Sequence, residues 1–160
     1  MANNVEIPKV VIVGHVDHGK SSLIGRLLYD IGEIPNEKFL ELKIASKKRG
    51  VDFEFAFLLD ALQDERDQGI TIDTTRVFFK TKKRKYVFID APGRKEFIRN
   101  MITGASSADI AILIVDVHEG IKAKTKKHTY LLKLLSIENV ITIFNKMHKI
   151  NYEEKKFLKV

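Results

Sequence analysis

The chain has 160 residues, of which 44% are hydrophobic and 31% are charged, with a net charge of +7. This composition excludes disorder over most of the chain and suits one domain with a single core. The absence of cysteine excludes disulfides, thiolate metal sites and cysteine nucleophiles. The longest aliphatic run, 110–115, is too short to span a bilayer, and no basic segment precedes an apolar stretch at the N-terminus. We therefore expect a soluble, cytoplasmic protein without a membrane anchor.

The first half of the chain predicts a strand followed by three helices. A run of β-branched residues at 10–13 is typical of a strand buried on both faces. Apolar residues with helical spacing predict a core-facing helix over 23–31. Asn36 is expected to cap a second helix that ends near Gly50, and apolar residues within 55–62 predict a third.

The second half predicts a hairpin and then an alternation of helices and strands. Residues 75–80 and 86–90 are joined by a short charged connection, which favours an antiparallel hairpin. The alternation that follows predicts helices at 97–105, 130–135 and 152–158 and strands at 110–115 and 140–144. One side of the helix before the last strand is expected to carry Tyr130, Leu131, Leu134 and Leu135. The pattern predicts a three-layer α/β domain with a mostly parallel sheet and one antiparallel hairpin strand.

A phosphate-binding loop is predicted between the first strand and the first helix. The residues there match the pattern G-x-x-x-x-G-K-[ST] with Gly14, Gly19, Lys20 and Ser21. Glycines let the backbone turn its N–H groups toward phosphate oxygens, the lysine adds a positive charge, and the serine hydroxyl can bind Mg²⁺. The predicted nucleotide-binding loop comprises Gly14, His15, Val16, Asp17, His18, Gly19, Lys20, Ser21 and Ser22.

Two histidines in this loop have spacing that suggests a metal site. His15 and His18 are three residues apart with Asp17 between them. A loop that wraps around phosphate directs these side chains differently, so we expect them to have no metal role.

The motifs together resemble the nucleotide-binding domain of translation-factor-type GTPases. GHVDHGKSSL, RDQGITID, DAPG and NKM occur in that order, and the resemblance covers about residues 8–148. GRLLYD and FIRNMITGASSADIAILIVD look most like the GTPase subunit of sulfate adenylyltransferase, which we slightly favour. FAFLLDALQDERDQGITID resembles archaeal and eukaryotic elongation factors, and GHVDHGK is nearer to elongation factor Tu. The resemblance implies a Ras-like P-loop fold that binds GTP and GDP with Mg²⁺ and hydrolyses GTP.

The resemblance also implies roles for individual residues. Thr71 would close on Mg²⁺ and the γ-phosphate, Asp90 would hold Mg²⁺ through water, and the Gly93 N–H would sense the γ-phosphate. Val16 and Ile70 match the apolar pair that gates water. Asn145 and Lys146 would flank the base. The implied sets are Ser21, Thr71 and Asp90 for the metal and Lys20, Thr71 and Arg94 for catalysis.

Two motif positions depart from the family. Arg94 stands where the family has the histidine that orients the attacking water, and arginine has only hydrogen-bond donors. His148 stands where the family has the aspartate that accepts two hydrogen bonds from guanine, and histidine accepts at most one. The sequence therefore predicts GTP hydrolysis that is impaired or dependent on a partner, and weakened discrimination of the base.

The resemblance also implies that residues 1–160 form a single, incomplete GTP-binding domain with no second domain. The family domain continues with another strand, a base-contacting loop and a closing helix, which do not follow Val160. We therefore expect the strand at 140–144 to form an apolar sheet edge that a protein partner or self-association covers.

Two basic clusters leave other functions open. Residues 82–85 and four lysines within 122–127 are most simply solvated surface, and an RNA or polyanion contact is the alternative. A non-catalytic module that holds a nucleotide to bind a partner is a further alternative, which near-zero turnover with preserved affinity would distinguish. An RNA-binding remnant would instead show salt-dependent binding that ignores nucleotide.

Overall fold

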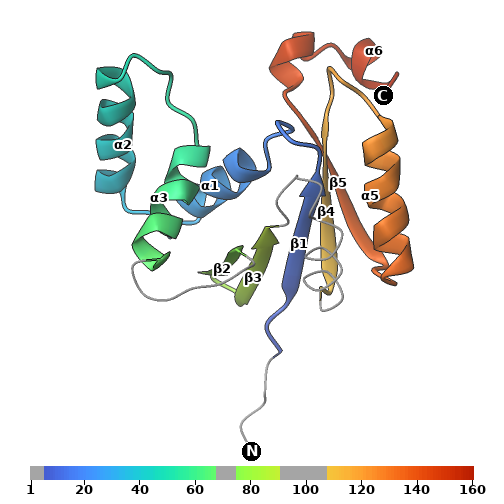
Figure 1. The fold of residues 1–160 in the computed structure, drawn as a ribbon, viewed down its shortest axis with the longest axis horizontal. Helices are drawn as coiled ribbons and strands as arrows, with labels where there is room; N and C mark the ends of the chain where they lie inside the picture. The colour runs from blue at the N-terminus through green and yellow to red at the C-terminus, as the bar shows by residue number, and fades with distance from the viewer. Residues whose placement is uncertain (1–5, 68–74, 91–107) are drawn as a thin grey trace, which may run out of the picture.

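A five-stranded sheet forms the centre of the computed structural model, which describes residues 6–67, 75–90 and 108–160 (Figure 1). Among the described residues the strand order is β2 (Thr75–Lys80), β3 (Lys85–Asp90), β1 (Lys9–Gly14), β4 (Ile110–Asp116) and β5 (Asn139–Asn145). The β2–β3 pair is antiparallel and the other pairs are parallel. The predicted mostly parallel sheet with one antiparallel hairpin strand is confirmed.

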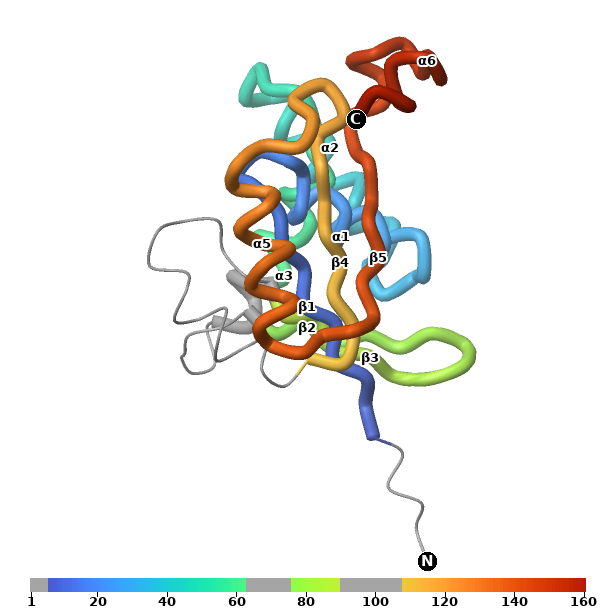
Figure 2. Tube along the Cα trace, turned by 90° about the vertical axis from the view of Figure 1, so that its right-hand side faces the viewer, coloured from blue at the N-terminus to red at the C-terminus, as the bar shows by residue number. Residues whose placement is uncertain are grey.

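Helices cover both faces of this sheet. On one side lie α1 (Lys20–Asp30), α2 (Asn36–Lys48) and α3 (Ala56–Asp67), and on the other lies α5 (Ala123–Leu134) (Figure 1). The chain ends with the short helices η1 (Met147–Ile150) and α6 (Glu154–Phe157), which Figure 2 shows beyond one end of the strands. The three predicted layers are therefore present, and the helix predicted at 97–105 lies outside the described residues. In the described part of the chain, no helix has the length and apolarity needed to cross a membrane.

The continuous apolar run in β1 is explained by burial on both faces. Val11 and Val13 belong to the cluster on the α5 side, together with Leu132. Val10 and Ile12 belong to the cluster on the opposite side, where α1 and α3 pack. Because alternate side chains point to opposite faces, a strand between two helical layers needs apolar residues at every position.

Close packing brings the segment before α3 against helix α1. A Cβ at Gly25 of α1 would overlap the carbonyl oxygen of Phe55. The ring of Phe55 also lies near that of Phe53, with ring centroids 5.4 Å apart. Glycine at position 25 therefore permits the contact that fixes the 53–56 segment beside α1.

The structure corrects the predicted start of α2. Pro35 is the residue that precedes the helix, and no side-chain hydrogen bond caps this end, so Asn36 is the first helical residue and not its cap. Proline fits here because its fixed φ suits a helix start. Phe39 of this helix stacks on Tyr29 of α1, with ring centroids 4.6 Å apart.

The predicted buried face of α5 was wrong in half of its residues. Tyr130 and Leu134 are 67% and 64% exposed, whereas Leu132 is buried and Leu131 and Leu135 pack beside it. The inward stripe is displaced because α5 lies over β1 and β4 and leaves the side toward β5 open. An apolar groove remains there, lined by Leu113, Val115, Ile121, Thr125, Lys126, Thr129, Tyr130, Lys133, Thr142 and Phe144.

The last strand is an edge of the sheet among the described residues, as expected. Val140 and Ile141 on β5 are 41% and 53% exposed. Phe144, nearer the carboxyl end, is half-buried and meets the ring of Phe157 edge-on at 5.0 Å.

Replacing Gly25 by alanine should destabilise the fold by about 2 kcal/mol, because the new Cβ forces the Phe55 carbonyl away from α1. Gly50→Ala is the matched control, since Gly50 has φ +71° but open space around it, and it should cost only about 1 kcal/mol. Urea unfolding of both variants measures the difference. Equal stability of the two variants would contradict the close-packing argument.

Candidate functional site

The loop between β1 and α1 has the tight backbone that its glycines predict. Gly14 ends β1, and a Cβ there would lie 2.7 Å from the Ile114 carbonyl oxygen. Asp17 and Gly19 both have positive φ, of 66° and 91°, and a Cβ at Gly19 would overlap the Asn145 amide. Glycine is thus needed at both ends of the loop because the backbone passes close to β4 and β5.

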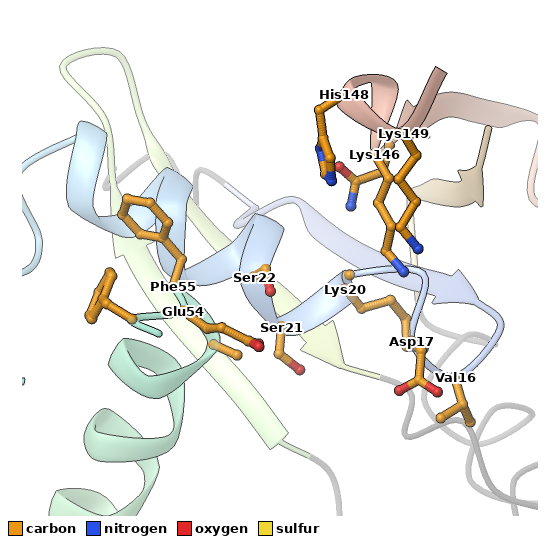
Figure 3. Close-up of a pocket in the computed structure, with 14 residues that line it drawn as sticks. Val16, Asp17, Lys20, Ser21, Ser22, Glu54, Phe55, Lys146, His148 and Lys149 are labelled. Atoms are coloured by element: carbon orange, nitrogen blue, oxygen red, sulfur yellow. The ribbon is translucent and has the colours of Figure 1, made fainter. Parts of the chain in front are cut away.

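Lys20 begins α1 and curls back over the loop. Its side chain is buried, and its Nζ donates to the carbonyl oxygens of Gly14 and His15, both at 3.0 Å. Ser21 and Ser22 follow in the first helical turn and line the same pocket (Figure 3). The positive end of the α1 dipole and the ammonium together favour an anion at this position.

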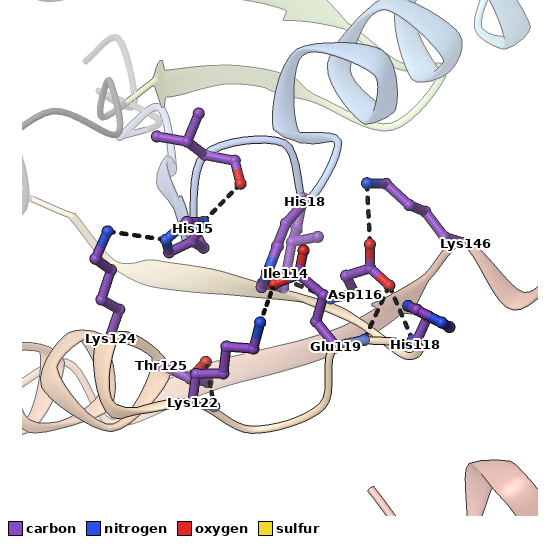
Figure 4. Close-up of polar contacts among 12 residues, drawn as sticks. His15, His18, Ile114, Asp116, His118, Glu119, Lys122, Lys124, Thr125 and Lys146 are labelled. Carbon is purple, nitrogen blue, oxygen red and sulfur yellow. Dashed lines mark hydrogen bonds and ion pairs between the residues drawn. The ribbon is translucent and has the colours of Figure 1, made fainter. Parts of the chain in front are cut away.

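His18 fastens the loop to the end of β4. Its ring is 1% exposed, and Nδ1 lies 3.2 Å from the Ile114 carbonyl oxygen and 3.3 Å from the Asp116 nitrogen. Either neutral tautomer therefore finds a partner on β4. Nε2 lies 3.6 Å from the Glu119 carboxylate, which also pairs with Lys122 at 2.8 Å (Figure 4). The His18 side chain therefore links the loop to the end of β4 and to the turn that follows it.

Several basic groups gather on the α5 side of the loop. His15 Nδ1 lies 2.7 Å from the Val16 carbonyl oxygen, and its Nε2 lies 2.9 Å from Lys124 Nζ (Figure 4). Burial lowers the pKa of His128, and the charges of Lys20 and its other basic neighbours lower it further. His15 and His18 thus have separate partners. Among the described residues, no group of three or more metal-binding side chains is found.

The motif predicted to read the base follows β5. Asn145 ends this strand, and its Nδ2 donates to the His18 carbonyl oxygen at 2.8 Å. Lys146 adopts the left-handed conformation with φ 61°, and its Nζ lies 2.9 Å from Asp116 Oδ2. His148 lies on η1 and is exposed. The structure therefore brings the loop and this motif together, although 127 residues separate His18 from Asn145.

A pocket of about 780 Å³ lies between these two groups (Figure 3). On one side it is bounded by the loop and the first turn of α1, and on another by residues 145–149. A third side is formed by the segment before α3. The lining residues are Val16, Asp17, Gly19, Lys20, Ser21, Ser22, Phe53, Glu54, Phe55, Ala56, Asn145, Lys146, His148 and Lys149.

Some predicted site residues fall outside the described part of the chain. Thr71 lies within 68–74, and Gly93 and Arg94 lie within 91–107. Asp90 is the last residue of β3, where its backbone pairs with Ile12 of β1. This position sets Asp90 one strand away from the phosphate loop, at the same carboxyl edge of the sheet.

Sequence reasoning missed two parts of the site. Asp116 is fully buried at the end of β4 and pairs with Lys146. An acidic residue at the carboxyl end of a buried parallel strand is a signal that could have found it. The segment 53–56 gave no such signal, because its place in the pocket depends on how α1 and α3 pack.

The arrangement can bind an elongated anion that carries a flat group. Lys20, Ser21 and Ser22 line one end of the pocket, where phosphates would bind. At the other end, the stem of Lys146 and the His148 ring supply walls for a planar ring.

The family comparison matches this arrangement. The model of the elongation factor Tu GTP binding domain family matches residues 5–160. Elongation factor 1-alpha of Archaeoglobus fulgidus is 44% identical over 158 residues, which are 98% of this chain and 37% of that protein. The same factor of Thermococcus celer is 48% identical over 151 residues, which are 92% of this chain and 34% of that protein.

A solved structure of a translation factor is also similar to this chain over most of its length. The crystal structure of a bacterial selenocysteine-specific elongation factor, EF-Sec, has a TM-score of 0.61 and 29% identity, over 94% of this chain and 21% of that one. The chain thus spans about a third of the length of the two elongation factors 1-alpha. Because the family model covers nearly all of the sequence, the chain belongs to the family of the elongation factor Tu GTP binding domain, among the translation-factor GTPases.

Proposed function

We propose that this chain binds GTP and GDP together with Mg²⁺ in the described pocket and hydrolyses GTP slowly. The observation that carries the proposal is the 2.8 Å hydrogen bond from Asn145 to the His18 carbonyl. It joins the phosphate loop to the base motif across one pocket, so a nucleotide can contact both at once. Membership of a GTP-binding family supports guanine as the base.

Lys20 and the loop backbone would hold the phosphates. The ammonium of Lys20 lies at the mouth of the loop, next to the Gly14 and His15 carbonyls. A phosphate oxygen is a stronger acceptor than a carbonyl because it is charged, so a bound nucleotide would take over this donor. The reaction needs no covalent intermediate, because positioning and charge neutralisation suffice for phosphoryl transfer.

The side chains available for Mg²⁺ fit this ion. Ser21, Thr71 and Asp90 offer a hydroxyl, a second hydroxyl and a carboxylate, and Mg²⁺ prefers such hard oxygen ligands. Ser21 lines the pocket in the first turn of α1. When bound, the ion neutralises charge on the phosphate oxygens.

His148 would weaken recognition of guanine. An aspartate at this position accepts two hydrogen bonds from the base, whereas a neutral imidazole accepts one at most. Hydrogen bonds to a charged group contribute roughly 1.5–3 kcal/mol each. The loss is therefore about 3 kcal/mol, which corresponds to a roughly hundredfold lower affinity.

Arg94 would limit hydrolysis. A residue that orients the attacking water must accept a hydrogen bond from it, and a guanidinium group only donates. Arg94 can still stabilise negative charge on the phosphates, so we expect slow turnover and not its complete loss.

The relatives favour a role in translation over one in sulfate activation. The two relatives described above are elongation factors 1-alpha, and the sequence-based preference for the sulfate-activating branch gains no support from them. We propose that a protein partner covers the apolar face of β5 and that RNA is a further candidate partner for the basic surface.

Replacing Lys20 by alanine should lower the affinity for GDP and for pyrophosphate by about 10²-fold or more, because a charge-assisted contact with phosphate is lost. Competition against a fluorescent GDP analogue in Mg²⁺ buffer measures both affinities. Lys127→Ala removes an exposed lysine of α5 and serves as the control. Unchanged pyrophosphate binding in the Lys20 variant would contradict the proposed phosphate site.

Replacing His148 by aspartate should raise the affinity for GDP about a hundredfold and leave pyrophosphate unaffected, because two hydrogen bonds to the base are restored. The same competition assay, with ADP and XDP added, measures the gain in discrimination. Asn151→Asp adds a similar charge just after η1, outside the pocket, and should change nothing. A gain that is equal for GDP and ADP would show that position 148 does not read the base.

Replacing Arg94 by histidine should speed single-turnover GTP hydrolysis by about 10²-fold, because the imidazole can accept a hydrogen bond from the attacking water. Rapid-quench measurement with excess protein gives the rate independently of product release. Arg49→His, just after α2, is the control. Equal rates for the wild type and the Arg94 variant would refute this explanation, and near-zero rates for both with intact GDP binding would favour a non-catalytic module.

A further inference from the structure

We propose that Asp116 is a positioning residue that holds Lys146 in place for the base. This inference rests on the proposed function and adds to it a residue outside the four motifs. Asp116 would act on the base only through Lys146.

Asp116 lies where the two halves of the site meet. It ends β4, which runs between β1 and β5, and its backbone pairs with Asn145 in the parallel register. Two residues earlier on the same strand, Ile114 pairs with Gly14 at the start of the phosphate loop. One strand end therefore contacts both motifs.

Each oxygen of the Asp116 carboxylate has a separate task. Oδ1 accepts hydrogen bonds from the backbone N–H groups of His118 at 2.9 Å and Glu119 at 3.4 Å, which closes the turn after β4. Oδ2 faces Lys146 Nζ at 2.9 Å (Figure 4). Lys149 Nζ lies 3.8 Å from the same oxygen. The contact with Lys146 is an ion pair and not a well-aligned hydrogen bond.

The carboxylate has no exposed surface, so it needs these cations. Burial alone would raise the pKa of Asp116, but the contact with Lys146 and the His118 N–H together hold it below its ordinary value. The group is thus ionised at neutral pH, and removal of its charge would release the lysine.

The ion pair with Asp116 restrains the side chain of Lys146, which would otherwise be flexible. Its backbone is fixed in the left-handed conformation just before η1, and its side chain is 21% exposed on the pocket wall. Anchoring the ammonium on Asp116 restrains the four-carbon stem before any ligand arrives. A base that packs on this stem then loses less free energy to ordering it.

Asp116 cannot act as a substitute for the aspartate that position 148 lacks. Its Oδ2 is completely enclosed, and Asp116 is absent from the residues that line the pocket. A base in that pocket would therefore meet Lys146 and not the carboxylate. This geometry makes Asp116 a positioning residue and not a binding residue.

The backbone of Asp116 has a different role, which a side-chain substitution leaves intact. Its N–H lies 3.3 Å from His18 Nδ1, and it contributes to fastening the phosphate loop. Asparagine at position 116 retains an oxygen for the N–H groups of His118 and Glu119, and it removes the charge that holds Lys146. The substitution thus separates the effect on Lys146 from the effect on the loop.

The test compares GDP and inorganic pyrophosphate in Asp116→Asn, using competition against the fluorescent GDP analogue. We expect a five- to tenfold loss of GDP affinity and no change for pyrophosphate. In a Lys146→Met background, which keeps an apolar stem without the ammonium, Asp116→Asn should cause no further loss. Asp109→Asn is the matched control, because Asp109 lies just before the other end of β4 and accepts the Lys9 N–H at 2.8 Å. It should change neither affinity.

Thermal unfolding checks that each variant folds. The double variant, Asp116→Asn with Lys146→Met, removes both partners of the ion pair, so no buried charge is left unpaired at position 116. Equal losses for GDP and pyrophosphate, or a loss of GDP affinity that persists in the Lys146→Met background, would overturn the inference and leave the proposed function standing. Wild-type protein that binds neither ligand would overturn the proposed function and this inference with it.

Discussion

Parallel pairing of β1, β4 and β5 is the constraint on which the nucleotide pocket depends. The register sets Gly14 opposite Ile114 and Asp116 opposite Asn145, so three strands end at one edge of the sheet. The loops that follow parallel strands leave that edge together, and ligands of α/β proteins bind there for this reason. Residues far apart in the chain therefore meet because the strands that precede them are paired.

The polar groups at this edge are arranged as a connected network. His18 is held by its ring on β4 and by its carbonyl through Asn145, while Asp116 fixes Lys146. Burial lowers the pKa of His128, and the positive charges of Lys20 and its other basic neighbours around the phosphate loop lower it further, so the imidazole is neutral at pH 7. An anion is the ligand that relieves this concentration of cations, and buried donors hold the loop in a shape that fits it.

Much of the fold could be predicted because the apolar runs in the strands are unambiguous. Val10–Val13 and 110–115 are strands buried on both faces, and the phosphate loop lies between a strand and a helix as predicted. The exposure of Tyr130 and Leu134 could not be predicted, since helical spacing alone does not fix which neighbouring stripe of α5 faces the sheet. Asn36 was wrongly predicted as the helix cap because Pro35 occupies the position before the helix.

Of the site residues, some were predictable from the sequence and others were not. The glycines, Lys20 and Asn145 are found by motif because their chemistry requires fixed spacing. Asp116 was missed because its partner, Lys146, is 30 residues away and meets it only through strand pairing. The roles of Thr71, Gly93 and Arg94 stay predictions, because these residues lie outside the described part of the chain.

The glycine that ends β1 has a consequence for how the sheet is aligned during folding. Val10–Val13 are all branched aliphatic residues, so a shift of β1 by one residue would still bury apolar side chains on both faces, and hydrophobicity alone selects no alignment. Only Gly14 fits against the Ile114 carbonyl, because any Cβ there would come within 2.7 Å of it. A residue that the motif predicts for phosphate binding therefore also fixes the alignment of β1 against β4.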